Sequence, residues 1–216
     1  MPHPLGHILF LYIMVDLFNY TRRASSVAHI GAIDLGGDNP IRIQSMTTTN
    51  TNDTEACVRQ AEEIIKAGGE LVRFTTQGSR EAENMKNINA GIRADGYQTP
   101  LVADVHFNPN VADVAALYCE KVRINPGNYV DPARKFIKQE YTDEEYAHEL
   151  QKIEERFVPF LNICKENHTA IRIGVNHGSL SDRIRNRYGD TPEGIVESCL
   201  EFLRICKKEN FHDVVI

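Results

Sequence analysis

The sequence predicts an α/β fold: a (β/α)8 barrel, or TIM barrel, truncated after about six strands. Short apolar strands alternate with amphipathic helices, and the strands recur at intervals of roughly 30–50 residues, as barrel units do. The chain has 216 residues, whereas such a barrel takes about 250. A Rossmann sheet is the alternative, but no G-x-G-x-x-G follows the first strand. The chain ends on an apolar strand, which would need a neighbouring strand on each side. We therefore expect this chain to be a piece of a longer protein.

The composition is that of an ordinary globular protein. Hydrophobic residues make up 42% of the chain and charged residues 25%. The formal net charge of −6 argues against a general nucleic-acid binder, which needs a basic surface. The five cysteines form no C-x-x-C pair, so we interpret them as reduced, buried thiols of a cytoplasmic protein. No local zinc or iron–sulfur motif is present, and the sequence predicts no metal ligands within this chain.

The amino-terminal segment is the one apolar run that suggests a membrane. Residues 8–15 are too few to cross a bilayer, which takes about 20 residues, and they lack the flanks of a secretory signal. We therefore predict no membrane association. Met14 is the expected natural initiator, residues 1–17 are an expected extension, and residues 18–216 form the incomplete barrel domain.

A hairpin and six strands are predicted in order along the chain. Turn residues clustered within 31–40 indicate the hairpin. The six apolar segments that follow are typical of buried parallel strands. They are residues 41–45, 71–74, 101–105, 122–124, 171–175 and 213–216.

Three helices are predicted between the first four of these strands. Asn52 or Asp53 caps the first, and Gly68 with Gly69 ends it. Ser79 opens the second, and residues 111–117 form a short third. The inward-facing apolar residues of the first two are Cys57, Ala61, Ile64, Ile65, Met85, Ile88 and Ile92.

Two further helices flank the fifth strand. Thr142 and Glu145 have the spacing of a capping box and open the first of them. Thr191 and Pro192 start the second, with proline at the first helical position. The residues expected to face inward are Leu150, Ile153, Phe157, Phe160, Leu161 and Cys164 in the first, and Ile195, Cys199, Leu203 and Cys206 in the second.

Polar side chains recur on one face of four strands. Residues i and i+2 of a strand lie on the same face. On each of these strands, one face carries an ionisable residue and, two residues further on, a second polar residue or a glycine. Because barrel active sites form where the strands end at their carboxyl termini, we expect these side chains to converge in the barrel mouth. The residues are Arg73, Asp104, His106, Arg123, Asn125, Arg172 and Asn176.

Three arginines in one concave site repel each other unless an anion lies among them. Arginine forks match phosphate oxygens, so the pattern predicts a small ligand with more than one phosphate. Asp104 would offset one charge, and His106 is an acid–base candidate. The alternatives are salt-bridged or solvated arginines and a structural, hydrogen-bonded His106. We interpret Arg42 as structural and the group Arg183, Arg185 and Arg187 as a solvated face.

Five segments together resemble the hydroxymethylbutenyl diphosphate synthase family. They are IRIQSMTTTNTND (41–53), LVRFTTQ (71–77), LVADVHFNP (101–109), VRINPGN (122–128) and IRIGVNHGSL (171–180). The resemblance runs from about residue 18 to residue 216. Residues 135–157 resemble an extra stretch seen in the larger, three-domain versions of the family.

The resemblance implies an iron–sulfur oxidoreductase of isoprenoid biosynthesis. The family converts 2-C-methyl-D-erythritol 2,4-cyclodiphosphate to 4-hydroxy-3-methylbut-2-enyl diphosphate in the methylerythritol phosphate pathway. A [4Fe-4S] cluster supplies two electrons from a ferredoxin or flavodoxin. The resemblance implies that Asp104 and His106 are catalytic residues and that the substrate-binding residues are Arg73, Arg123, Asn125, Arg172 and Asn176.

The chain departs from the family in one respect. The family's cluster ligands, three cysteines and a glutamate, belong to a carboxyl-terminal domain that this chain lacks, so we expect the fragment to be inactive alone. In shorter family members, a homodimer brings the cluster domain of one subunit over the barrel of the other; the oligomeric state of this protein stays open. A cluster-free transferase of the pteroate-synthase type and a non-catalytic binding module are the alternative functions.

Overall fold

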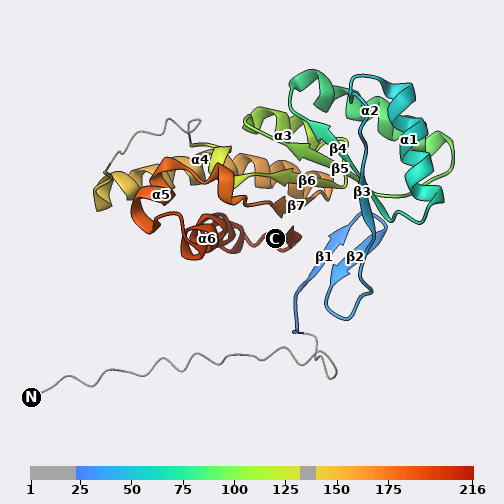
Figure 1. Cartoon of the computed structure of the whole chain (residues 1–216). Helices are drawn as coiled ribbons and strands as arrows, with labels where there is room; N and C mark the ends of the chain where they lie inside the picture. The colour runs from blue at the N-terminus through green and yellow to red at the C-terminus, as the bar shows by residue number, and fades with distance from the viewer. Residues whose placement is uncertain (1–22, 132–139) are drawn as a thin grey trace, which may run out of the picture.

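The computed structural model describes residues 23–131 and 140–216. Within these ranges the chain forms a six-stranded sheet, helices that cover its outer face, and an antiparallel hairpin, β1 (Val27–Ile30) and β2 (Ile33–Gly36) (Figure 1). The predictions for residues 1–17 and for the apolar run at 8–15 lie outside the described residues, as do residues 135–139. No helix in the described ranges is both long and apolar enough to span a membrane.

The sheet is parallel throughout, and its strands lie in the order of the sequence, β3-β4-β5-β6-β7-β8. A Rossmann sheet reverses its strand order at a switch point, and this sheet does not, so the barrel prediction is confirmed. The strands are β3 (Gln44–Met46), β4 (Leu71–Thr76), β5 (Leu101–Val105), β6 (Lys121–Ile124), β7 (Ala170–Ile173) and β8 (Val214–Val215).

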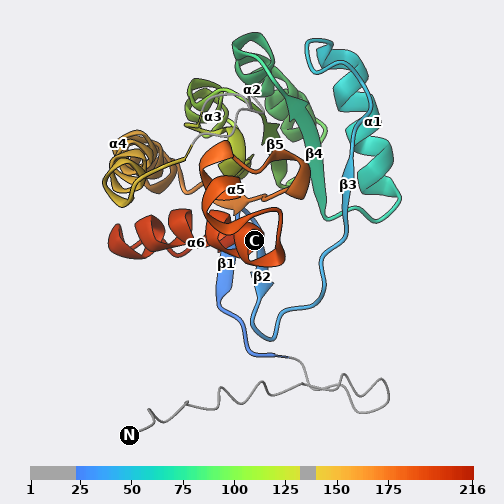
Figure 2. The same cartoon turned by 60° about the vertical axis from the view of Figure 1, so that its left-hand side comes forward.

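The sheet is curved, as barrel closure requires. Lys121 of β6 donates a hydrogen bond from Nζ to Oε1 of Gln44 on β3 at 3.1 Å. In the strand order, β6 is the third neighbour of β3, so the two strands would lie about 14 Å apart in a flat sheet. The bond therefore spans the concave interior, and the helices lie in an arc around the outside (Figure 2).

Four helices begin where the sequence predicts, after Asp53 and Thr142, at Ser79 and after Thr191. The third begins at Pro109 and not at residue 111, and the helix Asp182–Tyr188 was not predicted. Asp53 accepts a hydrogen bond from the Ala56 amide, and the Thr142 and Glu145 side chains form the expected capping box. The helices are α1 (Thr54–Lys66), α2 (Ser79–Ala94), α3 (Pro109–Ala115), α4 (Asp143–Asn167), α5 (Asp182–Tyr188) and α6 (Pro192–Lys208), with short 3-10 turns η1 (Pro126–Asn128) and η2 (His177–Ser179).

Alternation along the strands separates the two faces of the sheet. Val72 and Phe74 of β4, and the equivalent residues of the other long strands, pack beneath the helices in the main core. The opposite face holds Leu71, Val102 and Ala170, which are buried with Ile30 of the hairpin in a second cluster. The hairpin therefore covers the amino end of the barrel interior, and the carboxyl end is left for polar residues.

Two predicted elements differ from the structure. The first strand is β3 (Gln44–Met46), not 41–45, and Ile41 and Ile43 are 85% and 60% exposed. The reason is local, because Glu70 accepts hydrogen bonds from both the Arg42 guanidinium and the Ile43 amide and so holds this segment beside the start of β4.

The buried face of α6 is also rotated from the prediction. Only Cys206 of the expected stripe is fully buried; Ile195, Cys199 and Leu203 are half-buried. The helix instead turns Ser198, Glu201 and Phe202 inward, because Glu201 pairs with a buried arginine of α5. The predicted stripe is therefore offset from the centre of the buried face, although Cys199 and Leu203 still pack against the main core.

Candidate anion-binding site

Three predicted site residues lie side by side on adjacent strands. Asp104 of β5 is in register with Arg123 of β6, which is in register with Arg172 of β7. Arg73 of β4 reaches the same carboxylate from the other side. The structure therefore brings the three predicted arginines together on the concave face of the sheet.

Asp104 is the centre of this cluster. Its side chain is 5% exposed, and its oxygens lie 2.5 Å from Arg73 Nη2, 3.2 Å from Arg123 Nη1 and 3.3 Å from His106 Nε2. Burial alone raises the pKa of Asp104, but the His106 hydrogen bond and the two guanidinium charges outweigh it and hold that pKa below its usual value. Asp104 is therefore an ionised carboxylate at neutral pH.

Arg123 is fixed in place by a second acceptor. Its Nη2 donates to the Gly174 carbonyl at 2.7 Å, and Nη1 lies within 3.3 Å of the His106 ring. Burial lowers the pKa of Arg123, as does the charge of Arg73, while Asp104 opposes them. Burial is the main reason that the charged guanidinium is disfavoured here, and the neighbouring arginines add to it.

Two arginine nitrogens in this cluster have no acceptor. Nε of Arg73 and Nε of Arg172 are buried and make no hydrogen bond within the described structure. A buried donor without a partner costs about 1–3 kcal/mol, so such groups are rare in folded proteins. Here they are donors that an anionic ligand could satisfy.

Lys121 belongs to the same face, and sequence reasoning missed it. It lies two residues before Arg123, so the alternation that selected Arg123 also selects Lys121. The side chain is buried, and Nζ bonds to Gln44. Burial, with the charges of Arg172 and Arg73, lowers the pKa of Lys121 to about 8.

The two predicted asparagines cap the loops after β6 and β7. Asn125 accepts from the Gly127 amide and donates to Ser179 Oγ at 2.7 Å, so it ties the two loops together. Asn176 is exposed and accepts from the Gly178 amide at 3.0 Å. Both side chains lie above the strand ends, and their role in substrate binding stays a prediction.

The loop after β5 combines a polar and an apolar side chain. His106 contacts Asp104 and Arg123, as described, and its ring lies 5.7 Å from that of Phe107. Phe107 is 69% exposed and has a positive φ of 63°, which is uncommon for a bulky residue. Backbone strain of this kind is typical of functional loops.

The arginine group of α5 is not a uniform solvated face. Arg183 is 2% exposed and pairs with Glu201 at 2.6 Å and with Asp131 at 3.2 Å. The prediction for Arg183 was wrong, because its carboxylate partners come from distant segments that spacing does not reveal. Arg185 and Arg187 make the more exposed pairs, with Asp190 and Asp143.

Arg42 has the structural role that was expected. It donates from Nε to the Asp34 carbonyl and from Nη1 to the Glu70 carboxylate at 2.7 Å. These bonds join the hairpin to the start of β4. Arg42 therefore lies apart from the arginine cluster.

The described residues do not fit an iron–sulfur cluster. The five cysteines are free thiols; four are buried, and Cys199 is half-buried. Burial raises the pKa of each of these thiols, which opposes the thiolate form that binds iron. Within residues 23–131 and 140–216, no group of three or more His, Cys, Asp or Glu side chains is placed to hold a metal ion.

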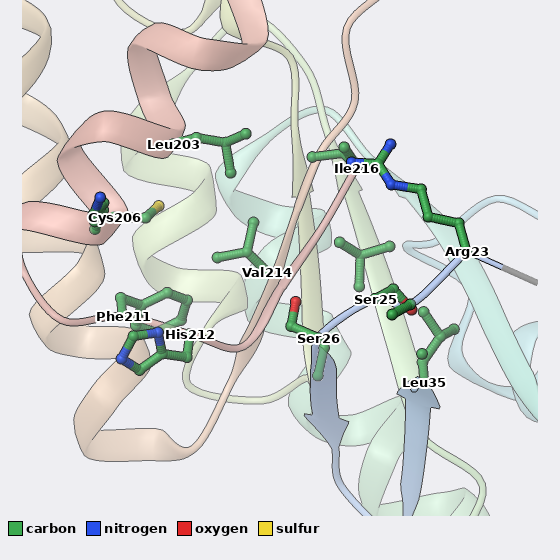
Figure 3. Close-up of a pocket in the computed structure, with 15 residues that line it drawn as sticks. Arg23, Ser25, Ser26, Leu35, Leu203, Cys206, Phe211, His212, Val214 and Ile216 are labelled. Carbon is green, nitrogen blue, oxygen red and sulfur yellow. The ribbon is translucent and has the colours of Figure 1, made fainter. Parts of the chain in front are cut away.

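A cavity of about 660 Å³ lies beside β8, and the three clustered arginines do not line it. Figure 3 shows it between Leu35 of the hairpin, Leu203 of α6 and the terminal Val214 and Ile216. None of the predicted site residues lines it. We therefore assign the candidate site to the arginine cluster and not to this cavity.

The fold and the cluster define a class: an α/β barrel protein with arginines on its concave face. Residues 25–216 match the family model of the GcpE TIM-barrel domain. The chain belongs to the GcpE family.

Relatives of this family share high identity with the chain. A 4-hydroxy-3-methylbut-2-en-1-yl diphosphate synthase (flavodoxin) of Phocaeicola vulgatus is 77% identical over 94% of this chain and 33% of that protein. The synthase of Bacteroides thetaiotaomicron is 76% identical, with the same coverage of each. The chain spans about a third of the length of these curated relatives.

Solved structures give only weak similarity. The 7,8-dihydropteroate synthase of Vibrio fischeri ES114 has a TM-score of 0.39 and 13% identity, over 86% of this chain and 76% of that chain. The β-methylaspartase of Clostridium tetanomorphum has a TM-score of 0.42 and 12% identity, over 74% and 39%.

Proposed function

We propose that this chain is the substrate-binding barrel of a 4-hydroxy-3-methylbut-2-enyl diphosphate synthase of the methylerythritol phosphate pathway. The enzyme opens the ring of 2-C-methyl-D-erythritol 2,4-cyclodiphosphate. Two electrons enter, the bond between a ring carbon and its phosphate oxygen breaks, and a protonated hydroxyl leaves as water. The names of the 76–77% identical relatives support this proposal.

The arginine cluster carries the proposal. Arg73, Arg123 and Arg172 face one described carboxylate partner, Asp104, and two of their buried Nε atoms lack acceptors. A diphosphate supplies both the missing negative charge and the missing acceptor oxygens. In this proposal the arginines bind the two phosphates, and Asn125 and Asn176 bind from the loops above.

Of the pair expected to be catalytic, Asp104 and His106, we propose that His106 transfers a proton and that Asp104 positions it. Because Asp104 is ionised and paired with two arginines, its role is to orient Arg73 and Arg123 and to hold the His106 ring. His106 is more exposed, at 26% of its side chain, and directly follows the carboxyl end of β5. We assign to it the transfer of a proton to the oxygen that leaves.

The redox centre belongs elsewhere in this proposal. The described thiols do not fit a [4Fe-4S] cluster, and the relatives are about three times as long as this chain. We place the cluster and its three cysteine and one glutamate ligands in a further domain, and we propose a flavodoxin, named with the relatives, or a ferredoxin as electron donor. The protein would act in the cytoplasm, and the fragment alone would bind substrate without turning it over.

Anaerobic isolation of the full-length gene product tests this function. We expect a brown protein that consumes the cyclodiphosphate when a reductant is supplied and releases 4-hydroxy-3-methylbut-2-enyl diphosphate. A colourless full-length protein, or a brown one that leaves the cyclodiphosphate unchanged, would count against the proposal. The matched control is the R172A variant, which should keep the colour and lose turnover at low substrate concentration.

A further inference from the structure

Lys121 is a buried cation beneath the arginine cluster. It is 2% exposed, and its neighbours in register are Val102 on β5 and Ala170 on β7, both apolar. Its Nζ has one hydrogen-bond partner among the described residues, Oε1 of Gln44 at 3.1 Å. An ammonium has three N–H donors, so this site leaves it incompletely satisfied.

The charges that face Lys121 are mainly positive. Arg73 on β4 and Arg172 on β7 act on Lys121 from two other strands, and Arg123 lies two residues after it on its own strand, β6. Asp104 on β5 is already bonded to Arg73 and Arg123. Gln44 on β3 is neutral, and the hairpin and β8 contribute the apolar Ile30 and Val215 to the layer below. Lys121 has no ion pair among the described residues.

We propose that Lys121 is a fourth cation of the anion site and that it takes up a proton when a phosphate-bearing ligand binds to the arginines above it. The proposal rests on the function proposed above and deepens it, since it assigns part of the diphosphate affinity to a residue below the barrel mouth. Lys121 is a positioning residue in this account: it acts through charge, and contact with the ligand is not required.

The physical reason is the change in local charge. In the free protein, burial and the neighbouring arginines lower the pKa of Lys121 to about 8. Such a group is mostly charged at pH 7, and a larger share of it is neutral at pH 8.5. A bound diphosphate adds negative charge within a poorly screened interior, favours the ammonium and draws in a proton.

Calorimetry of the full-length protein with 2-C-methyl-D-erythritol 2,4-cyclodiphosphate tests this. Titrations at pH 8.5 in buffers of different ionisation enthalpy give the number of protons taken up on binding. We expect uptake of a substantial fraction of a proton per site at pH 8.5 and much less at pH 7. Each phosphoryl group of the ligand has a single, strongly acidic hydroxyl, so the ligand does not titrate in this range.

Three variants make the assignment specific. K121M replaces the ammonium with an apolar side chain of similar length; it should abolish the uptake and weaken binding about tenfold at pH 7. K121R keeps a charge that does not titrate near pH 8; it should abolish the uptake and retain binding. K66M on the exposed surface of α1 is the matched control and should behave as the unaltered protein.

The outcomes separate this proposal from the proposed function. If the unaltered protein binds the cyclodiphosphate without buffer-dependent heat at pH 8.5, or if uptake persists in K121M, Lys121 has no such role and the proposed function stands. If the unaltered protein does not bind the cyclodiphosphate at all, both proposals fall. If K121M does not fold, the comparison of K121R with the unaltered protein still tests the role of Lys121. The proposal requires K121R to bind the cyclodiphosphate without taking up a proton.

Discussion

The Arg123 guanidinium and the Gly174 backbone fit against each other in the barrel interior. Nη2 of Arg123 donates to the Gly174 carbonyl at 2.7 Å. A Cβ on Gly174 would overlap Nε of the same guanidinium. Gly174 has no positive φ, so it is required here for space and not for backbone conformation.

We therefore predict that G174A displaces Arg123 from the site. The added methyl group should weaken cyclodiphosphate binding by roughly 10- to 100-fold, because a charge-assisted contact is worth about 1.5–3 kcal/mol. G178A is the matched control: a Cβ there lies 3.6 Å from its nearest neighbour, Oδ1 of Asn176. Calorimetric titration of both variants measures the difference, and equal affinities would contradict the assignment of Arg123.

The arginines should differ in how their loss affects stability. R172A removes a guanidinium with a buried, unpartnered Nε, so it should weaken cyclodiphosphate binding by roughly 10- to 100-fold at little cost in stability. R123A also leaves Asp104 and the Gly174 carbonyl with one partner fewer, so it should lower both affinity and the free energy of unfolding. Urea unfolding and calorimetry measure the two quantities, and R204A on the exposed surface of α6 is the control.

The site could be predicted from the sequence because strand alternation is a strict local rule. Arg73, Arg123 and Arg172 each lie between two apolar neighbours, and parallel pairing brings such positions together. The same rule applies to Lys121, which was missed because the predicted strand began one residue later, at Val122, whereas β6 begins at Lys121. Asp104 was expected to offset one charge, and the structure shows it paired with two arginines.

What could not be predicted depends on contacts between distant segments. Arg183 follows a helix cap in a run of charges, and only the fold reveals that Glu201 and Asp131 surround it. The same pair rotates α6 and so overrides its apolar stripe. Likewise, β3 begins later than its apolar pattern suggests, because Glu70 holds the preceding segment.

Removing Arg183 should destabilise the fold strongly. R183M leaves the buried Glu201 carboxylate with Tyr146 as its remaining described donor, and Asp131 loses its partner as well. The loss of one partner from a buried ion pair costs about 3–5 kcal/mol. We expect the double variant R183M/E201M to recover part of this loss, since no charge is then left unpaired at Glu201. Urea unfolding measures both, and a loss below about 1 kcal/mol in R183M would refute the buried network.

Asp104 should contribute stability that acid removes. Its pKa in the folded protein lies below the usual carboxyl value, so its contribution is complete above about pH 4 and is lost as the pH falls through the folded pKa. D104N has no carboxylate to protonate. The difference in unfolding free energy between the unaltered protein and D104N should therefore shrink below pH 4, as measured by urea unfolding at pH 7, 4 and 3. A difference that stays constant across this range would show that Asp104 is not stabilised by its arginines.

Lys121 should have the opposite dependence on pH. Its pKa falls from about 10.5 in the unfolded chain to about 8 in the folded protein, so the unfolded chain binds more protons between these values and the folded state gains stability as the pH rises. Because each pKa unit corresponds to about 1.4 kcal/mol, the charged lysine costs the empty site roughly 3 kcal/mol at pH 7. K121M should remove this cost, so it should be more stable than the unaltered protein at pH 7 and lose most of that advantage by about pH 10. Such a variant would be better folded and bind the cyclodiphosphate less tightly, which is expected of a buried charge kept for a ligand and not for the fold. Urea unfolding at pH 7 and 10, set against K66M, measures the difference, and a K121M protein less stable at pH 7 would contradict it.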